Sequence, residues 1–389
     1  MSITLTQEEL GRRLRMARIN CGLGQERAAL EIELPRPTIS QIEAGKRGVS
    51  SIELAKLARL YQRPLASFFE ERFDLNVTES PITVLFRSTE FLPEHKKVVA
   101  EFESLCRAYA DLEKRLGLES EMPLPDRSIL GEPRNKIEAI RQGEQVASEE
   151  RRRLGIGDDP IRNVLELLES QGVRLFVRRL EETHISGLFL FDKSLGPCIL
   201  INGAEHRNRL AFNAAHEYAH VLFDRKLQAR ASTTSTQLGN TNQSDELLEV
   251  RANSFAAAFL LPAFGIDRFL GDQGMTRRTK QKLDVVHVLY LQRAFGVSYL
   301  AALYRLQNLG WLDRNQREKL AKHKPDVLGR ELGLHDDGEF YIAAYPLRYV
   351  YLALEAYRQA KIPLIELAKL LGKRLPEAKR LVKKLGAEP

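Results

Sequence analysis

Apolar residues recur at helical spacing along most of this chain, and only a few short runs have the composition of strands. The helical pattern predicts helices over 93–118, 135–153 and 160–171. The apolar runs predict strands over 173–178, 187–191 and 198–202. The sequence therefore predicts a mainly α protein with a small β-sheet, an α+β fold.

The predicted helix 93–118 carries a stripe of large apolar side chains. Its members, at helical spacing, are Val98, Phe102, Leu105, Tyr109, Leu112 and Leu116. Such a stripe forms a seam between two copies of a chain, or it packs against a neighbouring helix of the same chain. The pattern is consistent with both.

Changes in this pattern divide the chain into regions. We expect a helical domain over residues 1–72 and a connector with the long helix over 73–134. A third domain is expected over 135–312 and a helical end over 313–389. Within the connector, residues 119–134 are rich in proline and are expected to be a linker. The polar tract 228–245 is expected to be mobile, either as a lid or substrate loop or as an inert insertion.

The pentapeptide His216-Glu217-Tyr218-Ala219-His220 lies inside one apolar helical pattern. Residues i and i+4 share a helix face, so His216 and His220 can direct two imidazoles at one metal ion. Glu217 would lie close enough to take a proton from a metal-bound water. The alternative is a pair of ordinary histidines on an amphipathic helix.

A third ligand is expected on the next helical pattern, which runs from Glu246 to Pro262. Glu249 is the preferred candidate, with Glu246, one turn earlier, as its rival; a solvated carboxylate is the structural alternative. Three protein ligands with one open position describe a catalytic zinc site rather than a structural one.

Several short motifs around these residues agree in order. They are Arg209-x-x-Phe212-x-x-x-His216-Glu217-x-x-His220, Glu249-x-x-Ala252-Asn253-x-Phe255-Ala256 and Leu260-Leu261-Pro262. Over about residues 135–310 the chain resembles the ImmA/IrrE family of metallopeptidases. The resemblance implies that His216, His220 and Glu249 bind Zn²⁺, with Mn²⁺ as the alternative ion. It also implies that Glu217 is the general base.

The N-terminal region reads as a helix, a short turn and a second helix. Leu23–Ala29 is followed by Pro35–Gly45, in which Pro37 suits a first helical turn and Gly45 a helix end. In the second helix Ile39 and Ile42 are expected to face inward, and Thr38 and Gln41 outward.

This region resembles the XRE family of Cro/C1-type helix-turn-helix domains over residues 7–70. The resemblance rests on Gln25, Ala29, Ile39, Ser40, Ile42, Glu43 and Gly45. The turn departs from the family pattern at Glu33, where glycine is usual, and at Pro35, where serine is usual.

In such a motif the second helix enters the major groove of DNA. We expect base contacts from Arg36, Thr38 and Gln41, and phosphate contacts from Gln25 and Arg47. The alternative is that these are ordinary solvated residues of a small helical bundle, since the region is only mildly basic.

Two later segments have related patterns. Residues 283–312 look like a second helix-turn-helix, with Ser298 as a natural N-cap. The resemblance to the ImmA/IrrE family, in which a similar helical unit accompanies the protease fold, implies first a structural role, and DNA contact is the alternative. The helical end, 345–389, is strongly basic through Lys369, Lys373, Arg374, Lys379, Arg380, Lys383 and Lys384. That charge is a solvated face or, less simply, a second nucleic-acid contact.

Composition bears on the binding partners and on the cellular location of the protein. The net charge of +7 tolerates contact with polyanions, and the three cysteines, Cys21, Cys106 and Cys198, are too scattered for a disulfide framework. No signal peptide or membrane span is expected, so a cytoplasmic location is predicted.

Two functions follow. The first is a DNA-binding transcriptional regulator, expected to be a homodimer on an operator, whose zinc-dependent peptidase cleaves a regulatory protein in trans or within its own chain. The second is a transcription factor whose metal-binding domain only senses a ligand or partner. The intact Glu217 favours the first function, whereas the fusion to a DNA-binding domain favours the second as a physiological role.

Overall fold

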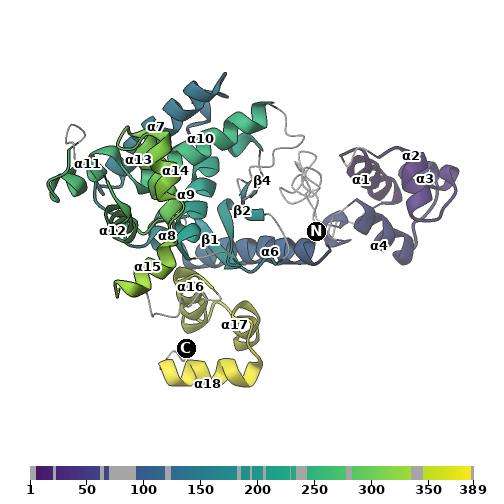
Figure 1. Cartoon of the computed structure of the whole chain (residues 1–389). Helices are drawn as coiled ribbons and strands as arrows, with labels where there is room; N and C mark the ends of the chain where they lie inside the picture. Colours follow the sequence, from purple (N-terminus) through teal and green to yellow (C-terminus); the bar gives the residue numbers. More distant parts are fainter. Residues whose placement is uncertain are drawn as a thin grey trace. The chain divides into compact units, whose positions relative to one another are not determined.

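The chain falls into two compact units, Met1–Arg87 and Ser88–Pro389, in a computed structural model (Figure 1). The structure describes residues 6–20, 23–61, 65–69, 93–118, 124–181, 185–192, 195–204, 207–227, 229–233, 243–276, 283–333 and 345–386. The finer domain boundaries expected from the sequence stay predictions.

The first unit is a small helical bundle. Its elements are α1 (Gln7–Asn20), α2 (Gln25–Glu31), α3 (Arg36–Glu43), α4 (Ser51–Leu60) and the 3₁₀ turn η1 (Leu65–Phe68). Ile39 and Ile42 are buried in its core, at 1% and 2% exposure, as the helical spacing predicts. A buried ion pair between Arg18 and Glu43 joins α1 to α3.

The turn between α2 and α3 has Glu33, and not glycine, at its left-handed position. Glu33 has a φ of 61°, in the left-handed region that glycine adopts without cost. Its backbone N–H donates to Leu30 O, and the next N–H, of Leu34, donates to Ala29 O, which closes the end of α2. The turn therefore keeps its conformation although Glu33 has a side chain.

The second unit is mainly helical around one four-stranded sheet. Its first helices are α6 (Pro93–Leu116), η2 (Ser128–Leu130), α7 (Lys136–Arg153) and α8 (Val164–Ser170), and the central ones are α9 (Arg207–Phe223), η3 (Arg225–Leu227), α10 (Gln243–Leu260) and α11 (Ala263–Gly271). The remaining helices are α12 (Val285–Phe295), α13 (Tyr299–Asn308), α14 (Arg314–Leu320), α15 (Pro325–Glu331), α16 (Leu347–Arg358), α17 (Leu364–Leu370) and α18 (Leu375–Leu385). With the sheet, they confirm the predicted fold class.

The strands β1 (Arg174–Arg178), β2 (Ile185–Asp192), β3 (Gly196–Asn202) and β4 (Ala229–Thr233) form a sheet in the order β1-β3-β2-β4. β1 is parallel to β3, and β2 runs antiparallel to both β3 and β4. Because side chains alternate along a strand, Leu175 faces the large core that includes α9, whereas Phe176 meets the aromatic rings of α6. The sheet is thus covered by helices on both faces (Figure 1).

Three helices form the body next to the sheet. α10 packs along both α7 and α9. Gly143 on α7 permits the close approach, since a Cβ there would lie 2.5 Å from the carbonyl oxygen of Arg251 on α10. A larger residue at position 143 would push the two helices apart.

The apolar stripe of the long helix is used inside the chain. Phe102, Tyr109 and Leu112 are buried, and the ring of Tyr109 packs on Phe176 of β1 and on Tyr349 of α16. The stripe is rotated slightly from its predicted register, since Val99 rather than Val98 is fully buried. Of the two readings, packing within the chain is the one the structure shows.

Two segments differ from the sequence-based expectation. The described part of the expected linker, 124–134, lies against α9 and η3: the Arg127 N–H donates to Leu222 O, and Arg225 donates to the carbonyl oxygens of Leu124 and Pro125. The polar tract begins with strand β4 and ends inside α10, because Ala229–Thr233 completes backbone hydrogen bonds along β2. Residues 234–242, the centre of the tract, lie outside the described residues.

One stretch, Asp245–Gly271, is long and apolar enough to cross a membrane, with a mean hydropathy of 1.3 in its most apolar window. The sequence-based expectation overlooked it. It consists of α10 and α11 with Pro262 between them, and its apolar residues belong to the core next to α7 and α9. This is the pattern of a core helix.

Candidate metal centre and DNA-binding helix

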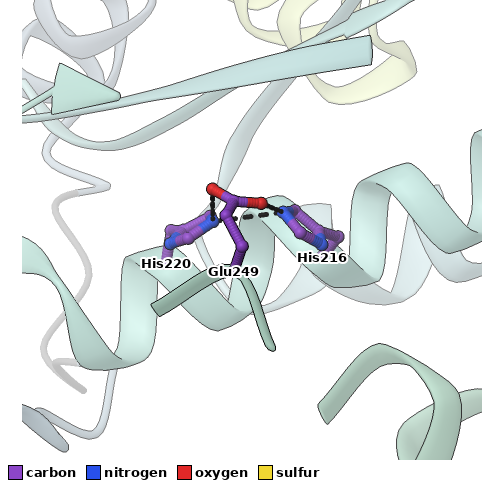
Figure 2. A group of neighbouring side chains, drawn as sticks. All are labelled: His216, His220 and Glu249. Atoms are coloured by element: carbon purple, nitrogen blue, oxygen red, sulfur yellow. Dashed lines mark hydrogen bonds and ion pairs between the residues drawn. The ribbon is translucent and has the colours of Figure 1, made fainter. Parts of the chain in front are cut away.

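The structure brings His216, His220 and Glu249 together (Figure 2). The Nε2 atoms of the two histidines lie 3.1 Å apart, and Glu249 Oε2 lies 3.2 Å from His216 Nε2. The other carboxylate oxygen, Oε1, is 3.6 Å from His220 Nε2. One potential ligand atom from each residue falls within a 4.8 Å cluster, an arrangement that can hold a single metal ion.

The opposite nitrogens of both imidazoles have partners of their own. His220 Nδ1 donates to Asp224 Oδ2 at 2.7 Å, and His216 Nδ1 donates to Asn253 Oδ1 at 3.1 Å. With the proton on Nδ1, the lone pair of each Nε2 is directed at the cluster, which is the tautomer that a metal needs.

Arg251 supports this arrangement from α10. Its guanidinium donates to Asp224 Oδ1 at 2.6 Å and to the Gln142 side chain at 3.0 Å, and it lies over the ring of Phe223. Asp224 is therefore held between His220 and a buried cation. Asp224 is not among the residues predicted from the sequence, although its position one turn after His220 is a usable signal.

Glu217 is not one of the three candidate metal ligands, although it follows His216 directly in the sequence. It is completely buried, and among the described residues neither of its carboxylate oxygens has a hydrogen bond of normal geometry, although the Ser232 hydroxyl on β4 lies close enough to lower its pKa. The backbone of β2 approaches it at Gly187, where a Cβ would lie 2.8 Å from Glu217 Oε1. Two buried oxygens without such a hydrogen bond are costly unless a ligand or bound water satisfies them, so this residue fits a site built around a metal ion.

Burial and neighbouring charges shift the pKa values of Glu217, Glu249 and His220. Burial raises the pKa of Glu217, against the opposing effects of the two histidines and of the Ser232 hydroxyl. Burial also favours a neutral Glu249, but the charge and hydrogen bonds of His216 and His220 outweigh it and hold the pKa of Glu249 well below its usual range. For His220, burial is outweighed by the hydrogen bonds to Asp224 and Glu249, which raise its pKa to about 9. The carboxylates of Asp224 and Glu249 favour a protonated His220, and a divalent cation would take the place of that proton.

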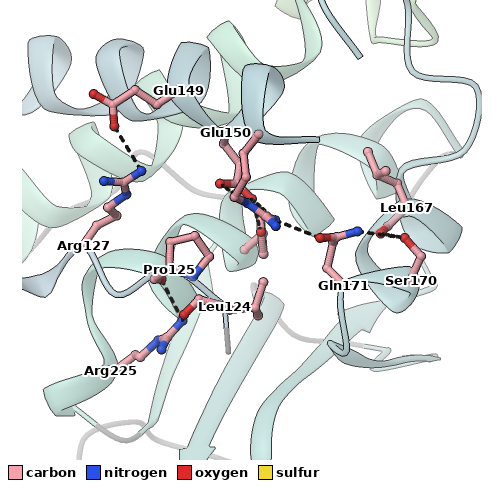
Figure 3. A network of polar contacts seen from close by, with 11 residues as sticks. Leu124, Pro125, Arg127, Glu149, Glu150, Leu167, Ser170, Gln171 and Arg225 are labelled. Carbon is pink, nitrogen blue, oxygen red and sulfur yellow. Dashed lines mark hydrogen bonds and ion pairs between the residues drawn. The ribbon is translucent and has the colours of Figure 1, made fainter. Parts of the chain in front are cut away.

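A polar network fixes the other side of α9. Tyr218 donates to the buried carboxylate of Glu150 on α7 at 2.5 Å, and Arg153 joins Glu150 to Gln171 after α8 (Figure 3). Since Tyr218 lies between Glu217 and His220 in sequence, this contact fixes the rotation of the helix that carries the site. Arg127 pairs with Glu149 at the edge of the same region (Figure 3).

The rival ligand lies elsewhere. Glu246 forms an ion pair with Lys136 at 2.6 Å, whereas Glu249, one turn later, contacts the histidines. The geometry therefore favours Glu249 for the third position. The sequence left both residues open because each occupies the first turns of the same helix.

The residues expected to meet DNA divide into two groups. Arg36 and Gln41 are exposed on α3, and Thr38 is half-buried rather than fully outward. Gln25 and Arg47 are tied to acidic side chains: Gln25 donates to Glu43 at 2.8 Å, and Arg47 pairs with Glu53. These two residues orient the motif in the described unit, and their expected phosphate contacts stay predictions.

Comparison with known protein families supports both the helix-turn-helix domain and the peptidase-like domain predicted from the sequence. Residues 9–67 match a helix-turn-helix domain, and residues 168–307 match the IrrE N-terminal-like domain of the M78 peptidases. No curated protein gives a significant match. Among solved structures, Bacillus thuringiensis PlcR in complex with the peptide PapR7 and DNA aligns over 98% of this chain and 96% of its own, at 12% identity. The TM-score of 0.17 is too low for that alignment to carry an argument.

Proposed function

We propose that this chain, in which a helix-turn-helix DNA-binding domain precedes an IrrE-type domain of the M78 peptidases, is a transcriptional regulator with a working Zn²⁺-dependent endopeptidase. Its substrate is a regulatory protein, in trans or in its own chain. The observation that carries the proposal is Glu217: a buried carboxylate whose two oxygens make no hydrogen bond of normal geometry with the described residues, next to three converging ligand side chains.

The metal's share of the chemistry is general. A bound Zn²⁺ ion supplies Lewis acidity, which polarises a peptide carbonyl and acidifies water. His216, His220 and Glu249 would hold it, and Mn²⁺ is the alternative ion. The residues Asp224 and Asn253 keep the imidazoles in the tautomer that binds.

Glu217 performs the proton transfers. Its carboxylate accepts a proton from the attacking water and passes that proton to the leaving amine nitrogen. Burial favours the protonated form of Glu217, which helps the carboxylate to accept this proton, and a bound cation would oppose that shift. Gly187 keeps the β2 backbone close, so the carboxylate has little room to turn away from the ligand cluster.

The alternative function is a metal-containing transcription factor that senses a ligand or partner without cleaving anything. It uses the same three ligands but gives Glu217 no role. Both functions place the N-terminal domain on an operator in double-stranded DNA, and for both we propose a homodimer in the cytoplasm.

Glu217→Gln separates these functions. The amide keeps the size of the side chain and cannot act as a base, so the variant should retain metal and DNA binding and lose cleavage by about two to four orders of magnitude. Cleavage products are followed by mass spectrometry after Zn²⁺ or Mn²⁺ is added, with total cell protein as the substrate pool and the parent chain as reference.

His216→Ala is the companion variant. It should lose the bound metal, measured as metal per chain, while the fold is retained. If the parent chain yields no cleavage product and Glu217→Gln answers the cellular signal as the parent does, the peptidase proposal is wrong and the sensor function stands.

A further inference from the structure

The C-terminal helices repeat the local geometry of the DNA-binding motif in the first unit. α2 and α17 each have seven residues, and the same short connection joins each to the next helix, α3 or α18. At the second position of that connection the chain is left-handed in both: φ is 61° at Glu33 and 59° at Gly372. Gly372 has the residue type that the turn favours, which Glu33 lacks.

The buried positions correspond as well. Ala29 and Ala368 are buried two residues before the last residues of α2 and α17, and Ile32 and Leu371 are buried at the start of the two turns. Each second helix then has proline in its first turn, Pro37 in α3 and Pro376 in α18. The two motifs thus agree in turn conformation, in burial and in how the second helix begins.

Helix-turn-helix geometry alone does not identify a DNA-binding surface, as the middle of the chain shows. α12 and α13 are also joined by a turn with a left-handed glycine, Gly296. In that motif one face of the second helix packs into the core, with Leu303, Leu306 and Arg305 all buried and Arg305 donating to the Leu261 carbonyl oxygen, and its exposed face carries the apolar Leu300 and Tyr304. Its structural role, predicted from the sequence, agrees with this packing.

α18 differs because its outer face is exposed and basic. Ala378 and Val382 face the core, whereas the other side carries exposed Lys379, Arg380, Lys383 and Lys384. Within the described part of the chain, none of these four cations forms an ion pair. The acids nearby have other partners: Glu377 pairs with Arg374, and Glu366 with Arg115.

The correspondence also places these cations. Counted from the matched prolines, Lys379 and Arg380 of α18 occupy the positions that Ser40 and Gln41 hold in α3. Gln41 is one of the residues expected to face DNA bases. A helix that enters the major groove brings this stretch near both the base edges and the flanking phosphates.

We propose that α17 and α18 form a second DNA-binding helix-turn-helix, whose ligand is the phosphate backbone of duplex DNA. Its basic face neutralises phosphates and adds affinity with little sequence preference, because lysines dominate it. The N-terminal motif then selects the operator, and the C-terminal motif strengthens the complex on any neighbouring duplex.

The test removes two charges from α18 in the full-length chain. Lys379→Gln/Lys383→Gln is compared with Lys319→Gln/Lys322→Gln, in which two other exposed lysines are lost. Binding to a random-sequence duplex of about 30 base pairs is measured over a range of salt concentrations. Each lost phosphate contact lowers the slope of log affinity against log salt by about 0.9, so the α18 variant should lose about 2 units of slope and the control none.

A second measurement guards against a folding defect. Circular dichroism should be unchanged, since both substituted lysines are exposed, and a hydroxyl-radical footprint on duplex DNA should shorten in the α18 variant only. Equal slopes for the parent and both variants would show that the basic face is simply solvated. Stronger competition by single-stranded RNA than by duplex DNA would also overturn the assignment.

Discussion

His220 and Asp224 form a 2.7 Å hydrogen bond across one turn at the end of α9, with Nδ1 of the imidazole facing the carboxylate. The second oxygen of Asp224 accepts from Arg251 on α10. This one carboxylate therefore couples the orientation of a candidate metal ligand to the packing of α9 on α10. The candidate metal site therefore depends on the packing of α9 against α10.

Asp224→Asn tests that coupling. The amide oxygen can still accept from Arg251, but the imidazole loses its charged partner and becomes a poorer ligand, so Zn²⁺ affinity should fall about 10- to 100-fold. Competition with a chromophoric chelator measures it. Asp272→Asn, at an exposed aspartate, is the control and should bind as the parent does. Parent-like affinity in Asp224→Asn would mean that the hydrogen bond does not tune the site.

Gly187→Ala tests the confinement of Glu217. The new Cβ would meet Glu217 Oε1 at 2.8 Å, so the carboxylate must move. Under the proposed function, cleavage should fall by about 100-fold, the scale of a misplaced catalytic group, while metal content stays near that of the parent. Gly271→Ala, whose Cβ would have no atom within 4 Å, is the matched control. Parent-like cleavage in Gly187→Ala would show that this contact is not needed.

Glu169→Gln tests a pH-dependent contribution to folding. Burial, with the charge of Glu166 adding to it, raises the pKa of Glu169 from 4.5 to about 7. The folded chain therefore holds this proton after the unfolded chain has lost it, and the group makes folding less favourable as pH rises from about 4.5 to about 7.

The glutamine variant lacks this titration. At pH 8 it should be more stable than the parent by about 1–2 kcal/mol, a value reduced for partial solvent screening, and at pH 4 the difference should vanish. Chemical denaturation at both pH values measures it, with Glu331→Gln, an exposed position, for comparison. A stability difference that is the same at both pH values would contradict the shift.

Arg36→Ala tests the assignment of α3. Arg36 is exposed at the first position of that helix, where a recognition helix meets base edges. The variant should lose about 1–3 kcal/mol of operator binding and relax the preference at one base pair. Selection of bound sequences from a random library identifies the operator and gives this comparison. Equal losses on operator and random DNA would reduce Arg36 to a phosphate contact.

Local patterns were enough to predict much of this protein from its sequence. Helix geometry alone places the side chains of His216 and His220 on one face, because they are four residues apart. The same helical period predicts the burial of Ile39 and Ile42. The α+β class was predictable because helical and strand-like runs differ in period within short windows. These features depend on residues that are close in the chain.

Tertiary structure decided the features that depend on distant residues. Glu249 rather than Glu246 reaches the histidines because α10 lies along α9 at one particular rotation. The confinement of Glu217 needs Gly187 from a strand, and the clamp on Asp224 needs Arg251 from another helix. No periodicity specifies which side chains of two helices or strands will meet, since that is fixed by how their faces pack.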